Sequence, residues 1–154
     1  GGITGIHPTK EGYLYISANT PHFWAALCEK TGLAELATER YDSVRKRAQH
    51  QDEIVPMLHR ALAARTALEW EAHFGEAVPC AAARSVEDMF DFPQVRSEGM
   101  VTTFEHPTVG RYRGFTRAIK FGRTPGPEPF AAPVLDQHGQ RVKAEADRLV
   151  SEGM

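Results

Sequence analysis

The residues best suited to chemistry in this sequence are seven histidines and two cysteines. No histidine stands at a recognised ligand spacing, such as H-E-x-x-H or C-x-x-C, and His59 and His73 fit exposed helix positions. We therefore expect no metal site. Cys28 falls within an apolar helical pattern and Cys80 within an apolar extended one. Those surroundings favour reduced core thiols over nucleophiles or a disulfide.

A cluster of cations with interleaved aromatic side chains lies between His106 and Pro127, where no acid occurs. It comprises Arg111, Tyr112, Arg113, Phe115, Arg117, Lys120, Phe121 and Arg123. On an extended strand, Arg111, Arg113 and Arg117 would project to one face. Such a stripe can bind phosphates or single-stranded nucleic acid. The formal net charge of -2 favours a solvated face of a hairpin instead. A nucleic-acid or polyanion-binding module using residues 111–123 is the first alternative function, and a purely structural interaction domain is the second.

Other local signatures of catalysis are missing from the sequence. It contains no P-loop, no G-x-G-x-x-G and no G-x-S-x-G, which removes the usual sequence evidence for a phosphate cradle or a serine elbow. The opening Gly1 and Gly2 fit a flexible loop. Only the order of weaker motifs along the chain can therefore indicate its function.

The first half of the chain predicts one strand and several helices. Residues 13–18 are aromatic and β-branched, which is typical of a strand. A helix is expected from Thr20-Pro21 to Gly32, with Trp24 on its apolar face. Residues 33–49 predict short helical turns on the surface. A second helix begins at Asp52, with Pro56 near its first turn.

Capping patterns and breakers divide the rest of the first hundred residues. Thr66 and Glu69 form a capping-box pattern, after which Trp70 faces the core. Residues 77–82 are apolar and extended because they contain a proline. A further helix start follows at Ser85.

The last third of the chain predicts a hairpin, an extended segment and a helix. Strands over 100–105 and 112–121 are joined by a proline and glycine turn. Residues 122–133 hold four prolines and two glycines, too many for a regular element. An amphipathic helix then carries Val142, Ala146, Leu149 and Val150. The fold class is therefore α+β: a small antiparallel sheet with packed helices, followed by an extended Pro-rich segment and a C-terminal helix.

Composition limits the class of protein. The chain has 154 residues, of which 42% are hydrophobic and 25% charged, as expected for a domain of ordinary size. It contains no apolar run of the roughly 18 residues that a membrane-spanning helix requires. The start lacks the basic and apolar regions of a signal peptide. We expect a cytoplasmic protein that binds no membrane.

Several weak motifs occur in the order found in class III CoA-transferases. They are Gly1-Gly2 with residues 9–16, Phe-Trp-Ala-Ala-Leu-Cys at 23–28, Arg47 with Asp52-Glu53-Ile54, residues 66–70, 77–82, 85–88 and 92–95, His106-Pro107 with Gly110, and residues 132–138. The chain thus resembles the carnitine dehydratase and bile-acid-inducible protein F group, which includes formyl-CoA transferase and α-methylacyl-CoA racemase. It departs from the pattern at Asp136, where glycine is usual, and at Gln137, where an acid is usual.

The resemblance implies that this chain corresponds to only part of a family member, because the family's chains are more than twice as long as this one. Residues 1–121 would be the small α+β domain, and residues 122–154 a linker and helix that return to a missing large domain. In the family an aspartate of the N-terminal half carries the acyl group, and most of the CoA site lies there too. No catalytic, cofactor-binding or metal residue is therefore expected here. Gly1 and Gly2 are the candidates for a substrate loop.

The activity of the parent protein also follows from the resemblance. It would transfer CoA between a carboxylic acid and an acyl-CoA, or racemise or isomerise an acyl-CoA. CoA or acyl-CoA would be a substrate of that parent enzyme, with no cofactor bound by this chain. The expected partners are the missing N-terminal CoA-binding domain and a second copy in a homodimer, and nucleic acid is not expected. The chain alone is expected to be inert.

Overall fold

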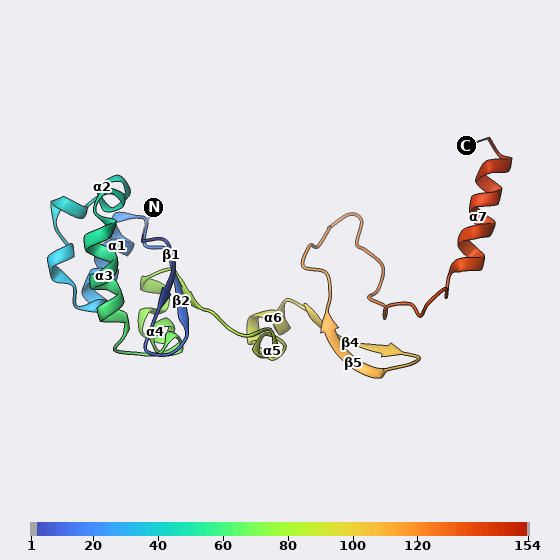
Figure 1. Cartoon of the computed structure of the whole chain (residues 1–154), viewed down its shortest axis with the longest axis horizontal. Helices are drawn as coiled ribbons and strands as arrows, with labels where there is room; N and C mark the ends of the chain where they lie inside the picture. Colours follow the sequence, from blue (N-terminus) through green and yellow to red (C-terminus); the bar gives the residue numbers. More distant parts are fainter. Residues whose placement is uncertain (1–2, 154) are drawn as a thin grey trace. The chain divides into compact units, whose positions relative to one another are not determined.

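A computed structural model describes residues 3–153, and the chain divides into two compact units, Gly1–Arg84 and Ser85–Met154 (Figure 1). The first unit contains β1 (Gly5–Pro8), β2 (Tyr13–Ile16), α1 (Pro21–Thr31), η1 (Ala34–Leu36), η2 (Glu39–Tyr41), α2 (Val44–Gln49), α3 (Gln51–Leu62), α4 (Ala67–Phe74), η3 (Gly75–Ala77) and β3 (Cys80–Ala82). The second contains α5 (Val86–Met89), α6 (Pro93–Ser97), β4 (Val101–His106), β5 (Gly110–Phe115) and α7 (Gly139–Ser151). The α+β prediction is confirmed.

An antiparallel sheet in the order β1-β2-β3 organises the first unit. His7 pairs with Leu14 and Leu14 with Ala82, and these three side chains are buried. Side chains alternate across a strand, so the neighbouring row faces outward. Ile6 and Tyr15 in that row are exposed. The helices α3 and α4 contact the sheet, and its inner face adjoins the core.

Helix α1 has the predicted boundaries. Pro21 occupies its first turn, and Gly32 ends it with φ +72°, a left-handed conformation that glycine adopts without strain. The Thr20 hydroxyl makes no capping bond. Trp24 is 4% exposed, and its indole N–H donates to the Leu36 carbonyl at 3.1 Å. The predicted burial of Trp24 is confirmed.

The prediction that residues 33–49 lie on the surface is wrong at three positions. Short helices do form there, but Leu36, Tyr41 and Arg47 are buried. The turns bring these side chains onto α1 and α3, and two of the three belong to the main core. Isolated apolar residues in short turns give no periodic signal, so this burial was not visible in the sequence.

Helices α3 and α4 complete the packing of the first unit. Pro56 lies inside α3 rather than in its first turn, and its exposed ring faces away from the core. The capping box at α4 is confirmed, because Thr66 and Glu69 bond each other's backbone N–H. Trp70 is 3% exposed, and its indole N–H donates to the Leu62 carbonyl at 2.8 Å. The helix therefore anchors the largest side chain of its apolar face, as predicted.

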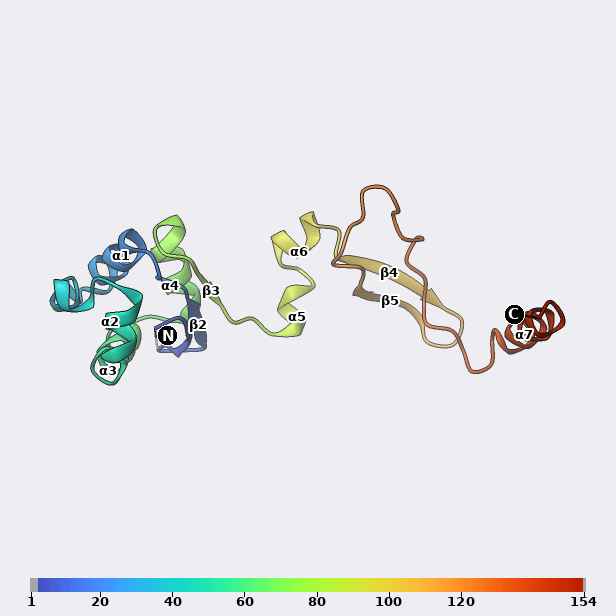
Figure 2. The same cartoon turned by 90° about the horizontal axis from the view of Figure 1, so that it is seen from above.

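The second unit is built on a two-stranded hairpin, and Figure 2 shows β4 and β5 side by side. Phe104 stacks on Tyr112 across the strands, with ring centroids 5.3 Å apart. The prediction that the second strand continues to residue 121 is wrong, since β5 ends at Phe115. Its partner residue, Val101, begins β4, so no strand residue remains for the chain beyond Phe115 to pair with.

The remaining chain follows the predicted order of extended segment and helix. Residues 122–133 form no helix or strand and are almost entirely exposed. Helix α7 presents Val142 and Val150, which are 60% and 78% exposed. Its apolar face is therefore uncovered within the part of the chain that the structure describes.

Amide exchange is expected to be fast from Gly122 to Pro133. No backbone hydrogen bond between described residues has its donor in this stretch, and four of its residues are prolines. The amides of α4 and β2 should exchange slowly because they belong to the packed unit. Hydrogen exchange of the dilute chain, followed by NMR or mass spectrometry, measures both. Protection across residues 122–133 equal to that of α4 would contradict the prediction.

Candidate functional site

The two residues proposed for a substrate loop, Gly1 and Gly2, lie outside the described residues. The structure does describe the turn that follows them. Ile3 is 5% exposed and belongs to the core. The Thr4 hydroxyl donates to Oδ1 of Asn19 at 2.7 Å, which links the turn to the loop before α1. The chain that follows the glycines is thus held at two points.

A histidine pair lies directly beneath this turn. His7 of β1 is 4% exposed, and its Nε2 lies 2.8 Å from the Ile3 carbonyl oxygen. Its Nδ1 lies 3.2 Å from Nε2 of His59 on α3, and the two rings meet edge to face with centroids 5.4 Å apart. The sequence-based placement of His59 and His73 on the surface is wrong, because both rings are half-buried. His59 contacts β1, and His73 contacts the Lys30 carbonyl.

The surroundings of this pair disfavour the protonated, positively charged form of His59. Burial lowers the pKa of His59 below its ordinary value, and the charge of His7 lowers it further. The pair joins residues 52 positions apart, so no local motif could reveal it. The available sequence signal was weak: His7 occupies an inward position of a short strand, and His59 follows the core residue Leu58.

The two cysteines are packing residues. Cys28 is buried in α1 and Cys80 is half-buried at the start of β3, and both are free thiols. Burial raises the pKa of each thiol to about 11. A thiol with so high a pKa is almost entirely protonated near neutral pH and is a poor nucleophile. The prediction of core thiols is confirmed.

Arg47 is a buried cation that the sequence did not single out as buried. It is 3% exposed and donates to the carbonyls of Tyr41 at 2.9 Å and Asn19 at 2.7 Å. Its guanidinium lies 4.8 Å from the centre of the Trp24 ring, within the range of a cation–π contact. Burial lowers its pKa. Arg47 therefore fastens the loop before α1, which also carries the Thr4 contact.

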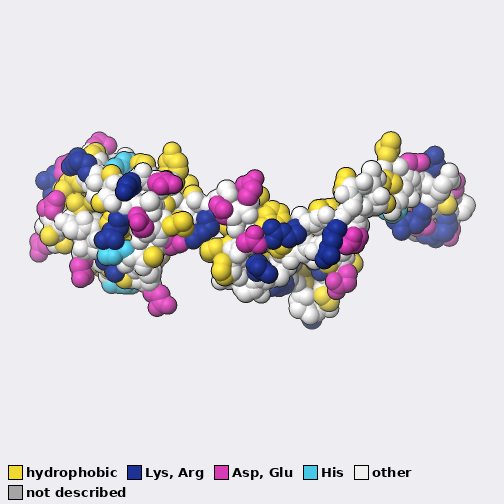
Figure 3. All heavy atoms as spheres, turned by 90° about the horizontal axis from the view of Figure 1, so that it is seen from below, with side chains coloured by type: hydrophobic (Ala, Val, Ile, Leu, Met, Phe, Trp, Pro, Cys, Tyr) yellow, Lys and Arg dark blue, Asp and Glu magenta, His cyan; other side chains and the backbone are white. Residues whose placement is uncertain are grey.

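Three of the five cations in the predicted basic stripe pair with neighbouring acids. Arg113 pairs with Asp91 at 2.7 Å and Lys120 with Glu98 at 2.9 Å, while Arg111 lies 3.6 Å from Glu105. The hydrogen bond from Arg113 also lowers the pKa of Asp91. In the face shown in Figure 3, basic and acidic side chains are interspersed over this unit.

The geometry of the stripe also differs from the prediction. Arg111 and Arg113 share a face of β5, but Arg117 lies beyond the end of the strand. Its guanidinium donates to the Pro127 carbonyl instead of extending the row. Arg111, Arg113 and Arg117 therefore do not form the single row that the sequence predicted.

Two surface cavities of the second unit flank Thr116 and Arg117. One of about 440 Å³ also includes Lys120 and Phe121 in its wall. The other, of about 350 Å³, includes Phe130. Lys120 in the first cavity pairs with Glu98, and Arg117, which lines both cavities, donates to the Pro127 carbonyl.

Residues 3–153 contain no group of three or more His, Cys, Asp or Glu side chains placed to hold a metal ion. Within the same residues, no helix has the length and apolar content needed to cross a membrane.

Comparison with known proteins gives the context of these features. The sequence model described as CoA-transferase family III matches residues 2–139. The chain belongs to CoA-transferase family III. The resemblance predicted from the ordered motifs is therefore confirmed.

Curated relatives within CoA-transferase family III share modest identity with the chain. The succinyl-CoA:glutarate CoA-transferase of Mus musculus is 30% identical over 142 residues, which cover 91% of this chain and 33% of that protein. The formyl-CoA:oxalate CoA-transferase of Rhodopseudomonas palustris BisB18 is 24% identical, covering 96% and 36%. The chain thus spans about a third of the length of these relatives.

Solved structures confirm the fold. A CAIB/BAIF family protein from Brucella suis superposes with a TM-score of 0.68 at 22% identity, covering 92% of this chain and 37% of that one. The D175A mutant of Rv3272 from Mycobacterium tuberculosis gives a TM-score of 0.70 at 20% identity, covering 89% and 38%.

The structure also explains one departure from the family pattern. Asp136, at the position where the resemblance to the family predicts glycine, adopts φ +60°. Glycine takes this left-handed conformation without the steric cost of a Cβ, while aspartate is among the residues that tolerate it. The turn before α7 therefore keeps a conformation that suits glycine despite the substitution.

Proposed function

We propose that this chain is the small domain of an enzyme that transfers CoA between a carboxylic acid and an acyl-CoA. The observation that carries the proposal is the family III match over residues 2–139. The relative at 30% identity is named for transfer between succinyl-CoA and glutarate. A dicarboxylic acid is therefore the acceptor that we infer first.

In such an enzyme, the chain would cover the active site and position the substrate without supplying a catalytic residue. Covalent acyl transfer needs a carboxylate nucleophile and a site that orients the thioester. We place that nucleophile and the CoA site in the missing N-terminal domain. Gly1 and Gly2 would approach the substrate, and residues 122–154 would return to the large domain. The exposed apolar face of α7 supports this docking. We further propose a cytoplasmic homodimer.

A chimera tests the proposal. Residues 1–154 replace the matching third of the mouse succinyl-CoA:glutarate CoA-transferase, and mass spectrometry follows glutaryl-CoA formed from succinyl-CoA and glutarate. We expect transfer by the chimera. The remaining mouse segment without this domain, and residues 1–154 alone, should each lose at least 100-fold of that rate. The reason is that one lacks the covering domain and the other the nucleophile.

Two results would contradict the proposal. A chimera that folds and dimerises but transfers no CoA would show that this domain does not support the reaction. Turnover by residues 1–154 alone, or an acylated Asp or Glu within them, would show that the chain has its own catalytic site. Salt-dependent oligonucleotide binding would support the alternative module, which the ion pairs of Arg113 and Lys120 disfavour.

A further inference from the structure

We propose that His7 and His59 form a latch that tolerates one proton but not two, and that it positions the turn leading from Gly1-Gly2 into β1. The positioning of substrate rests on the proposed function. The latch itself is a property of the isolated chain. It is defined by three contacts: His7 with Ile3, His7 with His59, and Thr4 with Asn19.

The hydrogen atoms of the pair follow from the partners. A carbonyl oxygen only accepts, so Nε2 of His7 must carry the hydrogen that bonds Ile3. In neutral His7 the other nitrogen, Nδ1, then has a lone pair. Nε2 of His59, 3.2 Å away, must therefore donate to it. This leaves Nδ1 of His59 as the remaining basic atom, with no hydrogen-bond partner among the described residues.

The same arrangement decides how many protons the pair holds. One proton on the pair leaves both hydrogen bonds intact, because one of the two facing nitrogens, Nδ1 of His7 and Nε2 of His59, still accepts from the other. With two protons, every ring nitrogen of the pair carries a hydrogen, and neither of the facing nitrogens can accept. Two N–H groups would then face each other at 3.2 Å, and the contact between β1 and α3 would have to open.

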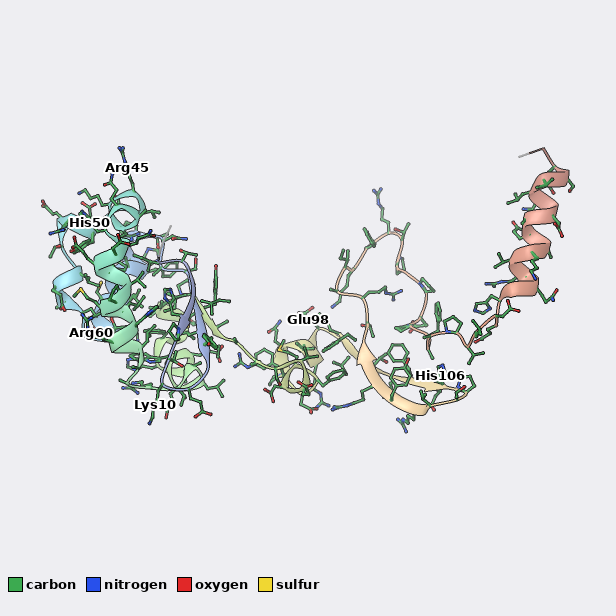
Figure 4. All side chains as sticks on the ribbon, in the orientation of Figure 1. Lys10, Arg45, His50, Arg60, Glu98 and His106 are labelled. Atoms are coloured by element: carbon green, nitrogen blue, oxygen red, sulfur yellow. The ribbon has the colours of Figure 1, made fainter. Side chains whose placement is uncertain are left out.

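Nearby charges do not compensate for a second positive charge. Arg60, next to His59 on α3, is exposed, as are Lys10 and Glu11 in the β1–β2 turn (Figure 4). Glu69 of α4 is used in the capping box with Thr66. Among the described residues, neither ring has a carboxylate within ion-pair distance, since only His50 among the histidines forms such a pair.

Because the turn is buried, opening the latch would affect the stability of the first unit. Ile3 is 5% exposed and His7 4% exposed, so opening the pair exposes core surface. Because folding lowers the pKa of His59, the free energy of unfolding depends on pH. The unfolded chain binds the proton more readily, so this stabilisation is complete above about pH 6.5 and is lost as the pH falls from there through the lower pKa of folded His59. The carboxylates, with ordinary pKa values near 4.3, act only at lower pH.

NMR of the full 154-residue chain from pH 8 to pH 5 tests the latch. Long-range nitrogen–proton spectra of the imidazoles should show His7 with its hydrogen on Nε2 at pH 8. The amide shifts of Ile3 and Thr4 should stay constant while the pair takes up its first proton. They should then move together in a second step at lower pH.

His59→Gln is the decisive variant, with His73→Gln as its matched control. Glutamine can donate to Nδ1 of His7 or, after rotating its amide, accept from it. The variant should therefore keep the pH 8 shifts of Ile3 and Thr4 and abolish their low-pH step. His73, whose ring contacts the Lys30 carbonyl at 3.2 Å, should be replaceable without changing that step.

Two results would overturn the latch. One is His7 with its hydrogen on Nδ1 at pH 8, a measurement that needs no variant. The other is an unchanged low-pH step in His59→Gln. In an active chimera, His59→Gln should flatten the acidic limb of the transfer rate. If NMR confirms the latch but the variant leaves the acidic limb of the transfer rate unchanged, only the positioning role is refuted. The transfer assay without variants tests the proposed function separately.

Discussion

Trp70→Ala is expected to lower the free energy of unfolding of the first unit by about 3–5 kcal/mol, the range for removing a large buried aromatic side chain. The indole is 3% exposed and stacks on Phe74 with ring centroids 5.1 Å apart. Its N–H also satisfies the Leu62 carbonyl at the end of α3. The substitution therefore creates a cavity and leaves a carbonyl without its partner.

Leu68→Ala is the matched control for Trp70→Ala, because Leu68 lies on the same helix and is 58% exposed. Its effect should stay within about 0.5 kcal/mol. Urea titration followed by circular dichroism measures both variants. A loss below about 1 kcal/mol in Trp70→Ala would show that the ring is not part of a close-packed core. Trp24→Ala should cost a similar amount, since Trp24 is equally buried.

Arg47→Ala is expected to cost about 2–4 kcal/mol, because a buried carbonyl that loses its donor costs about 1–3 kcal/mol and a part-buried one costs less. The affected carbonyls are those of Tyr41 and Asn19. The variant also removes the guanidinium from the face of Trp24. Lysine has one ammonium group in place of the planar fork, so Arg47→Lys should recover only part of the loss.

Arg45→Ala controls for the loss of a cation from α2, since Arg45 is exposed on the same helix. Its cost should be within about 0.5 kcal/mol. The same urea titration separates the cases. Equal, small effects of Arg47→Ala and Arg45→Ala would contradict the bridging role of Arg47.

Local features of the sequence predicted the helices that depend on near neighbours. The ends of α1 follow from Pro21 and Gly32, and the start of α4 follows from the reciprocal bonds of Thr66 and Glu69. The Pro-rich segment and the amphipathic helix after it were predicted for the same reason. Such signals act over about four residues, within one helical turn, and do not depend on residues distant in the sequence.

Family membership was also visible in the sequence, through the order of motifs that the match over residues 2–139 confirms. The candidate site was hardly predicted at all. Gly1 and Gly2 remain a prediction, and the other residues considered, the basic stripe and the cysteines, have partners or packing roles.

Tertiary structure alone decided where the long-range pairs form. His7 meets His59 across 52 positions, and Asp91 pairs with Arg113 across 22. The end of β5 depends on where its partner strand begins. Charge, burial and strand length at these places are set by residues that are distant in sequence. No pattern within a helical turn or a single strand carries that information, because it arises only when the packed elements bring those side chains together.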